Sequence, residues 1–220
     1  MQMEDSGFSM MMTPKLAITC IVITVISIMI RLAYVIYQSS KPLKNLAQQP
    51  VSTLIVLGSG GHTAEMLNLV SILKKERFTP RFYVAASTDN MSLQKSRVLE
   101  TSLVDQIYRS REVGQSYLTS VSTTLIAICH ALLLMIKIRP QVIICNGPGT
   151  CIPLCIIAFL FKVAGIRWSS IFYVESIARV KRLSLSGLLL YKLRIADQIF
   201  VQWPQLQSKY PQTHYVGCLM

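Results

Sequence analysis

The chain lacks the short motifs that usually mark a metal centre or a nucleotide site. Its six cysteines contain no C-x-x-C pair and no cysteine–histidine cluster with zinc spacing. Cys151 and Cys155 suit one face of a helix, but two thiols need further ligands to hold a metal. A Gly-Lys-Ser or Gly-Lys-Thr sequence is also absent, which excludes a P-loop. We therefore expect neither a bound metal nor a cofactor.

Acidic residues are also scarce. Aspartate and glutamate number 10 against 22 lysines and arginines, so the formal net charge is +12. A positive charge suits a phosphorylated substrate, an anionic membrane surface or nucleic acid. Because the basic residues are scattered and no zinc-finger or RNA-binding signature occurs, we expect no nucleic-acid partner.

Apolar residues are abundant, at 52% of the chain, and they concentrate near the N-terminus. After a short tail at 1–15, residues 16–37 form an almost uninterrupted apolar run in which Arg31 is the only charge, which predicts a transmembrane helix. A cleaved signal peptide is the alternative, but the tail has Lys15 as its only basic residue and no A-x-A site follows. Lys41 and Lys44 come after the run, and the next acid is Glu65, so the positive-inside rule places residues 38–220 in the cytosol.

Beyond a polar linker at 38–52, strand-like and helix-like segments alternate through residues 53–220. Strands are expected at 53–57, 81–87, 106–109, 141–145, 169–174, 198–201 and 214–216, and helices at 63–76, 90–100, 116–138, 150–165, 184–195 and 204–210. The strands are apolar throughout, which favours a doubly wound, Rossmann-like parallel sheet with helices on both faces. Ligands then lie at the carboxyl ends of the strands. The helices at 116–138 and 151–165 are apolar enough either to be buried or to lie on a bilayer.

A glycine loop follows the first strand. Its sequence, Gly58-Ser-Gly-Gly-His-Thr63, leads into a helix for which Thr63 is a candidate N-cap, and a helix N-terminus offers free N–H groups to a phosphate. Thr63 stands where a dinucleotide fingerprint needs its third glycine, which argues against a nucleotide-dependent oxidoreductase. A plain structural turn is the alternative to a phosphate site. The candidate phosphate-binding residues are Ser59, Gly60, Gly61 and Thr63, with His62 at the edge of the loop.

A second loop of the same design follows the strand at 141–145. It contributes Asn146, Gly147, Gly149 and Thr150 as candidate phosphate-binding residues. Glu175 directly follows another apolar strand, where a general base would stand, although an ion pair or a helix cap would use an acid there equally well. Arg109 and Arg111 also fall near strand ends, where they either neutralise phosphates or form a solvated basic face.

Five strings in this region resemble one family. They are Gly58-Ser-Gly-Gly-His-Thr63, Arg109-Ser-Arg-Glu-Val113, Cys145-Asn-Gly-Pro-Gly-Thr150, Tyr173-Val-Glu-Ser176 and Phe200-Val-Gln-Trp-Pro204. The family is the membrane-anchoring subunit of the two-chain UDP-N-acetylglucosamine transferase of dolichol-linked oligosaccharide synthesis, and the resemblance covers residues 53–220. Gly60-Gly-His62 also resembles, more distantly, the first glycine loop of the bacterial enzyme that adds GlcNAc to the lipid II precursor.

The resemblance implies the acceptor-side half of a split GT-B glycosyltransferase. A soluble partner subunit would bind UDP-GlcNAc and dock at the C-terminal tail, residues 215–220. The implied reaction transfers GlcNAc, with inversion, to O4 of GlcNAc-diphosphodolichol on the cytosolic face of the endoplasmic reticulum, and the N-terminal tail would be lumenal. His62 is the first candidate for the general base and Glu175 the second, because Val174 replaces the histidine that precedes this acid in the bacterial enzyme. A non-catalytic membrane scaffold that only tethers the partner is the alternative.

Overall fold

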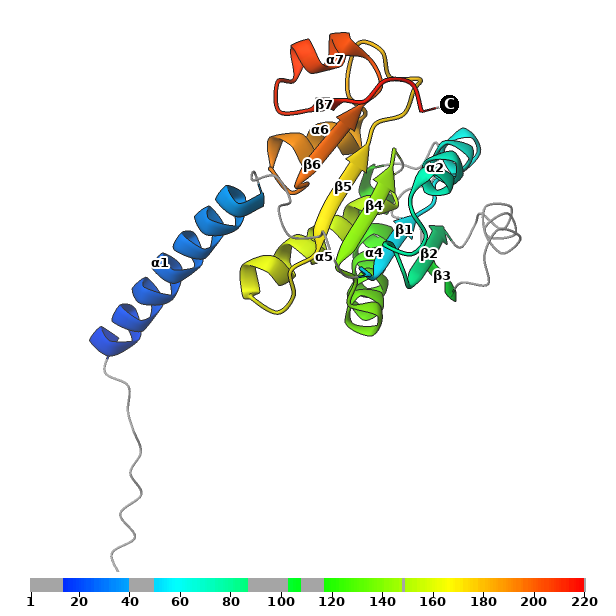
Figure 1. The fold of residues 1–220 in the computed structure, drawn as a ribbon. Coiled ribbons are helices and arrows are strands. Elements are labelled where there is room, and N and C mark those ends of the chain that lie inside the picture. The colour runs from blue at the N-terminus through cyan, green and yellow to red at the C-terminus, as the bar shows by residue number, and fades with distance from the viewer. Residues whose placement is uncertain (1–13, 40–49, 87–102, 108–116, 148, 220) are drawn as a thin grey trace, which may run out of the picture.

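The computed structural model describes residues 14–39, 50–86, 103–107, 117–147 and 149–219 (Figure 1). The strands in this part of the chain are β1 (Thr53–Val56), β2 (Arg81–Ala86), β3 (Leu103–Ile107), β4 (Val142–Asn146), β5 (Ser170–Val174), β6 (Gln198–Val201) and β7 (His214–Tyr215). The helices are α1 (Pro14–Ser39), α2 (Gly61–Ile72), α4 (Tyr117–Ile138), α5 (Cys151–Ala164), α6 (Leu185–Lys192) and α7 (Pro204–Lys209).

The strands form one parallel sheet in the order β3-β2-β1-β4-β5-β6-β7. Successive side chains of a strand point to opposite faces, so one apolar strand supplies both cores. Leu54 and Val56 of β1 pack with α4, α5 and α6, whereas Ile55 packs with α2 on the other face. The expected doubly wound, Rossmann-like sheet is confirmed.

Most expected boundaries differ from the structure by a few residues, and two of the differences bear on the site or the sheet edge. The third strand runs over Leu103–Ile107, earlier than the expected 106–109. Helix α2 begins at Gly61 and ends at Ile72, so Gly60 and not Thr63 occupies the N-cap position. The helix expected at 90–100 lies outside the described residues.

Helix α1 is long and apolar enough to cross a membrane. It extends the expected run of 16–37 to Ser39. Its last turns pack on the domain, because Val35 and Ser39, one helical turn apart, are both buried. Arg31 donates from Nε to the carbonyl of Val163 and from Nη2 to that of Lys162, both at 3.3 Å. A cation is favoured at these last carbonyls of α5, where the helix dipole is negative.

The two most apolar helices of the domain differ in their surroundings. Helix α5 is largely buried, with Leu154, Cys155 and Ala158 fully inaccessible to solvent, so the interpretation of a buried helix holds there. Helix α4 buries one side in the core but exposes Leu133 and Ile136 on the other. Of these two helices, α4 therefore presents the apolar outer side of the kind that could face a bilayer.

The C-terminal tail follows the edge of the sheet at β6 and β7. Val216 N–H donates to the carbonyl of Val201 at 3.1 Å, and Leu219 N–H donates to Oε1 of Gln202 at 3.0 Å. Between this tail and α2 lies a pocket of about 260 Å³ with an entirely apolar lining. Phe172 of β5 and Phe200 of β6 line it together with the side chains of Val216 and Leu219.

Candidate functional site

Three loops meet at the carboxyl edge of the sheet because β1, β4 and β5 are neighbours in it. The loop after β1 carries the glycines and His62, β4 ends at Asn146, and Glu175 and Ser176 follow β5 directly. Segments far apart in the sequence therefore contribute side chains to one edge, as the parallel sheet predicts.

The His62 ring is held by a chain of hydrogen bonds across these loops. His62 Nδ1 lies 3.1 Å from Asn146 Oδ1, and Asn146 Nδ2 donates to Glu65 Oε2 at 2.8 Å. Ser176 Oγ donates to the other carboxylate oxygen of Glu65, also at 2.8 Å. Asn146, Glu65 and Ser176 are all buried, whereas His62 is half-exposed. The network therefore joins α2 to the ends of β4 and β5 and leaves one side of the imidazole accessible.

This network determines which ring nitrogen of His62 is free. A carboxylate only accepts hydrogen bonds, so the amide NH₂ of Asn146 must face Glu65 and its oxygen must face His62. That oxygen is itself an acceptor, so Nδ1 of the neutral imidazole carries the hydrogen. Nε2 is then the unprotonated nitrogen. The geometry is that of a base whose second nitrogen is oriented by a polar partner, the arrangement that general-base catalysis requires.

His62 lines a pocket of about 410 Å³ at this edge of the sheet. The pocket is lined by Gly61, His62, Glu65, Ser176, Ala178 and Arg179. Arg179 is exposed and brings a guanidinium to the same opening as the imidazole. A guanidinium and the free N–H groups of a helix N-terminus both favour anionic oxygens. The pocket can therefore hold a phosphorylated group beside the His62 imidazole.

Glu175, the second candidate base, lies elsewhere. Its carboxylate is fully buried beneath α6 and accepts hydrogen bonds from Ser184 N at 2.8 Å, from Ser184 Oγ at 3.0 Å and from Ser176 N at 3.1 Å. Ser184 is the N-cap of α6 and in turn accepts from Gly187 N. Burial raises the pKa of Glu175 despite these hydrogen bonds. The structure therefore gives Glu175 the surroundings of a helix-capping acid, and Glu175 is not among the residues that line the His62 pocket.

The other residues that were expected to bind phosphate differ in their exposure to solvent. Ser59, Gly60, Gly61 and Gly149 are exposed at the carboxyl edge, and Gly147 is half-exposed and lies against the His62 ring. Thr63 is buried and donates to the carbonyl of Gly58 at 2.6 Å, so its hydroxyl closes the loop on itself. Thr150 is buried in the N-cap position of α5, where its side chain makes no capping hydrogen bond. Arg109 and Arg111 lie outside the described residues.

Sequence reasoning missed two members of the network, Glu65 and Ser176. A signal for Glu65 was present, because it follows His62 by three residues and therefore shares its helix face. The sequence gives no such signal for Ser176, because a serine after a strand occurs in many structural roles. Asn146 was expected to contact phosphate, but its side chain is occupied by His62 and Glu65.

Comparison with solved structures shows the class of fold to which the chain belongs. The described chain superposes on the crystal structure of Acinetobacter baumannii MurG with a TM-score of 0.57 at 16% identity, covering 76% of this chain and 44% of that one. A UDP-N-acetylglucosamine 2-epimerase gives a TM-score of 0.55 at 16% identity, covering 73% and 42%. The chain thus spans less than half the length of either protein. It is a Rossmann-like domain of the kind found in these larger proteins.

The sequence then identifies the family. Residues 53–219 match the family described as oligosaccharide biosynthesis protein Alg14 like. Proteins named UDP-N-acetylglucosamine transferase subunit ALG14 are 46% identical in Yarrowia lipolytica and 42% identical in Homo sapiens. These alignments cover 76% and 77% of this chain and 80% and 83% of the relatives. The chain belongs to the Alg14 family.

Proposed function

We propose that this chain is the membrane-anchored, acceptor-binding subunit of a two-chain UDP-GlcNAc transferase and that it contributes the catalytic base. The reaction would add GlcNAc to O4 of GlcNAc-diphosphodolichol. The observation that carries the catalytic part is the Glu65–Asn146–His62 chain of hydrogen bonds, which leaves Nε2 of His62 free at the pocket. A subunit that only tethers its partner would have no use for an oriented, half-exposed imidazole.

The chemistry assigned to His62 is a single proton transfer. Nε2 takes the proton from O4 of the acceptor sugar as O4 bonds to C1 of the donor GlcNAc. The bond from C1 to the diphosphate oxygen breaks on the opposite face, so the configuration inverts and UDP leaves with the electron pair. The imidazolium that forms keeps its Nδ1–H bonded to Asn146, and the nearby carboxylate of Glu65 stabilises its charge.

The acceptor diphosphate is assigned to the exposed rim of the glycine loop. Ser59, Gly60 and Gly61 stand at or before the start of α2, where backbone N–H groups are unpaired within the helix. Arg179 approaches the same opening and would neutralise part of the charge. Thr63 and Thr150 have no part in this assignment because both are buried.

The partner subunit is assigned to the C-terminal tail and the apolar pocket beside it. A lining without polar surface suits an apolar segment of another chain. Gln202 connects this surface to the site: its Oε1 accepts from Leu219 in the tail, and its Nε2 donates to the carbonyl of Glu175 at 3.1 Å. Docking at the tail would therefore act directly on the loop that carries Ser176 and Arg179.

The membrane assignment is a single span with the domain in the cytosol at the endoplasmic reticulum. Helix α1 is the candidate span, and the basic residues that follow it favour the cytosolic side for the domain. Residues 1–13 lie outside the described structure and are assigned to the lumen. The exposed apolar side of α4 would rest on the same bilayer.

The test is a GlcNAc-transfer assay on the chain co-purified from membranes with its soluble partner. His62→Gln should lower kcat by roughly a hundredfold or more, the usual range for a general base, while the partner still co-purifies. His130→Gln is the matched control, because His130 is exposed on α4. Undiminished transfer by His62→Gln with the partner bound would refute catalysis by this chain and favour the tethering alternative.

A further inference from the structure

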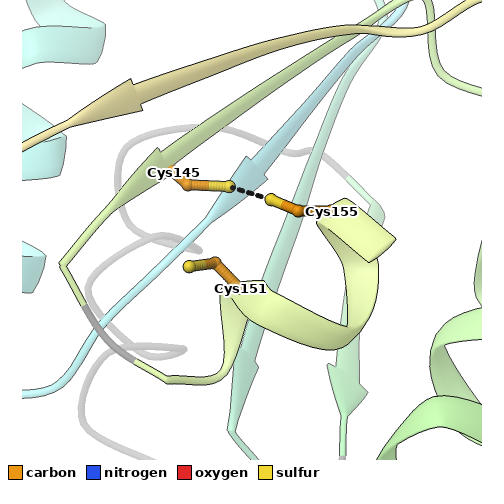
Figure 2. A group of neighbouring side chains, drawn as sticks. All are labelled: Cys145, Cys151 and Cys155. Carbon is orange, nitrogen blue, oxygen red and sulfur yellow. Dashed lines mark hydrogen bonds between the residues drawn. The ribbon is translucent and has the colours of Figure 1, made fainter. Parts of the chain in front are cut away.

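Three cysteine side chains meet in the core behind the second glycine loop. Cys145 comes from β4, and Cys151 and Cys155 come from the first two turns of α5 (Figure 2). Their sulfur atoms all lie within 4.8 Å of one another, and the Sγ atoms of Cys145 and Cys155 are 3.7 Å apart. None of the three is in a disulfide, and all three are fully buried. The sequence shows only the pair on α5, and the fold supplies the third sulfur.

The spacing of these atoms suits a metal ion. An ion bonded to three thiolates at about 2.3 Å separates the sulfurs by roughly 3.8 Å in a tetrahedral site and 4.0 Å in a planar one. These values are close to the 3.7 Å separation and fall within the 4.8 Å limit. The group contains no carboxylate or imidazole among the described residues. An all-sulfur set selects soft cations, above all Cu⁺ and Zn²⁺.

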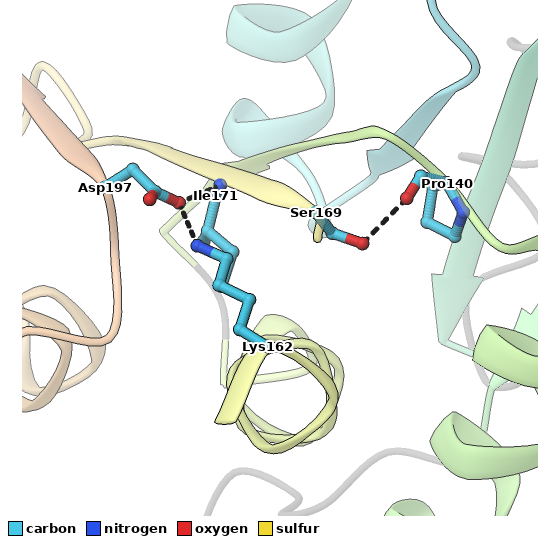
Figure 3. A network of polar contacts seen from close by, with 5 residues as sticks. All are labelled: Pro140, Lys162, Ser169, Ile171 and Asp197. Atoms are coloured by element: carbon cyan, nitrogen blue, oxygen red, sulfur yellow. Dashed lines mark hydrogen bonds and ion pairs between the residues drawn. The ribbon is translucent and has the colours of Figure 1, made fainter. Parts of the chain in front are cut away.

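One buried cation shares helix α5 with two of the cysteines. Lys162 is buried and pairs with Asp197 (Figure 3), so its charge is balanced by that carboxylate and not by the thiols. A metal displaces the protons of the thiols that bind it, so binding should tighten as the pH rises.

We propose that Cys145, Cys151 and Cys155 form a binding site for one thiophilic cation, Cu⁺ or Zn²⁺. Cys145 and Cys151 bracket residues 146–150, so the ion would join the two ends of the second glycine loop. Asn146, which orients His62, is the residue next to Cys145. A bound ion would therefore stiffen the support of the imidazole. None of its ligands lines the His62 pocket, so metal binding can be measured without the proposed transfer reaction.

The experiment uses the full chain, purified in detergent under reducing conditions and freed of metal. Zn²⁺ and Cu⁺ are titrated separately against a chromophoric chelator, and metal content is measured after gel filtration. We expect one equivalent of at least one ion and a higher unfolding temperature. Uptake of neither ion by the folded wild-type chain would overturn the proposal.

Two kinds of variant locate the site. Cys155→Ser should weaken binding by roughly tenfold or more, as loss of a metal ligand does, whereas Cys218→Ser should not, because Cys218 is exposed in the tail. If Cys155→Ser fails to fold, alkylation of the wild-type thiols shows instead which cysteines bind the metal. In a denaturant concentration at which the metal-free chain labels at Cys145, Cys151 and Cys155, bound metal should protect these three but not Cys129. Equal labelling of all four with metal present contradicts the assignment.

Discussion

The His62 ring lies so close to Gly147 that a Cβ atom added to the glycine would be 2.5 Å from His62 Cε1. Gly147 also has a φ of 67°, which disfavours any residue with a side chain. Gly147 therefore has two structural roles. It turns the chain after β4, and it leaves the space that the imidazole occupies. The ring is held by Asn146 at its edge and by Gly147 at its face.

Gly147→Ala should displace His62 and lower the transfer rate at least tenfold while leaving the fold intact. The backbone cost alone is about 1–2 kcal/mol, which the control Gly165→Ala shares. Gly165 has a φ of 73°, but an alanine Cβ there would lie an ordinary 3.5 Å from its nearest neighbour, Arg31 Nη2. Thermal unfolding of both variants and transfer assays of both measure the two effects separately. Equal activity in the two variants would argue against a specific role for the space beside His62.

Glu65→Gln should lower kcat roughly tenfold, because one orienting hydrogen bond contributes about 1–3 kcal/mol. A glutamine offers one acceptor oxygen where Glu65 offers two, so its NH₂ group must face Asn146 or Ser176, and it carries no charge to stabilise the imidazolium. The KM for UDP-GlcNAc should not change, since Glu65 is assigned no contact with the donor. Steady-state kinetics make the comparison, and Glu76→Gln, at an exposed site just beyond α2, is the control. A change confined to KM would mean that Glu65 binds substrate and does not position His62.

Glu175→Gln should keep most of the transferase activity, because the Glu175 carboxylate holds Ser184, the N-cap of α6, and does not line the His62 pocket. Its effect should appear in stability. The raised pKa means that the folded state keeps the proton to a higher pH than the unfolded chain does. The contribution of Glu175 to the free energy of unfolding is therefore complete below its pKa in the unfolded chain. It is lost as the pH rises through the pKa that Glu175 has in the folded protein.

The glutamine cannot ionise, so it escapes that loss. Denaturant unfolding at pH 4 and pH 7 should show the free-energy difference between variant and wild type shifting in favour of the variant at the higher pH. A shift in the opposite direction would mean that the folded pKa is depressed. Loss of activity as severe as in His62→Gln would restore Glu175 as a candidate base.

Lys162→Met should destabilise the domain by about 3–5 kcal/mol, the range for leaving one partner of a buried ion pair alone. Asp197 Oδ2 would keep only its hydrogen bond from Ile171 N at 2.6 Å (Figure 3). The double variant Lys162→Met with Asp197→Asn should recover most of the loss, because it removes both charges. Chemical denaturation of the wild type, the single variants Lys162→Met and Asp197→Asn, and the double variant tests this coupling. Additive effects of the two single changes would show that the pair does not interact.

The sequence pattern was sufficient for the sheet and for the edge at which the candidate residues meet. Apolar strands alternating with helices predict parallel order, and that order places Gly58–His62, Asn146 and Glu175 at one edge. The same pattern did not predict the roles of individual side chains. Glu175 and Glu65 are both acids near strand ends or a glycine loop, and what distinguishes them is which way each carboxylate points. That direction depends on packing against α6 and on the amide of Asn146, which no local pattern records.

The same holds for boundaries and for the cysteines. Thr63 has a good N-cap side chain, but the glycines let the helix start two residues earlier, and its hydroxyl bonds to Gly58 instead. Cys145 precedes Cys155 by 10 residues, and the loop between them carries no pattern that places their sulfurs together; the return of α5 after β4 does so.

In the proposed membrane arrangement, the contact between α1 and α5 would set the height of the reaction above the bilayer. The part of α1 that is free of the domain, residues 15–30, is about 24 Å long, which is short of a bilayer core of about 30 Å. Arg31 would then lie at the membrane surface. From there β5 runs in the same general direction as α1 for about 16 Å (Figure 1). To reach His62, the head of a membrane-embedded acceptor would have to rise by that distance, or the domain would have to lean toward the lipid on its α4 side.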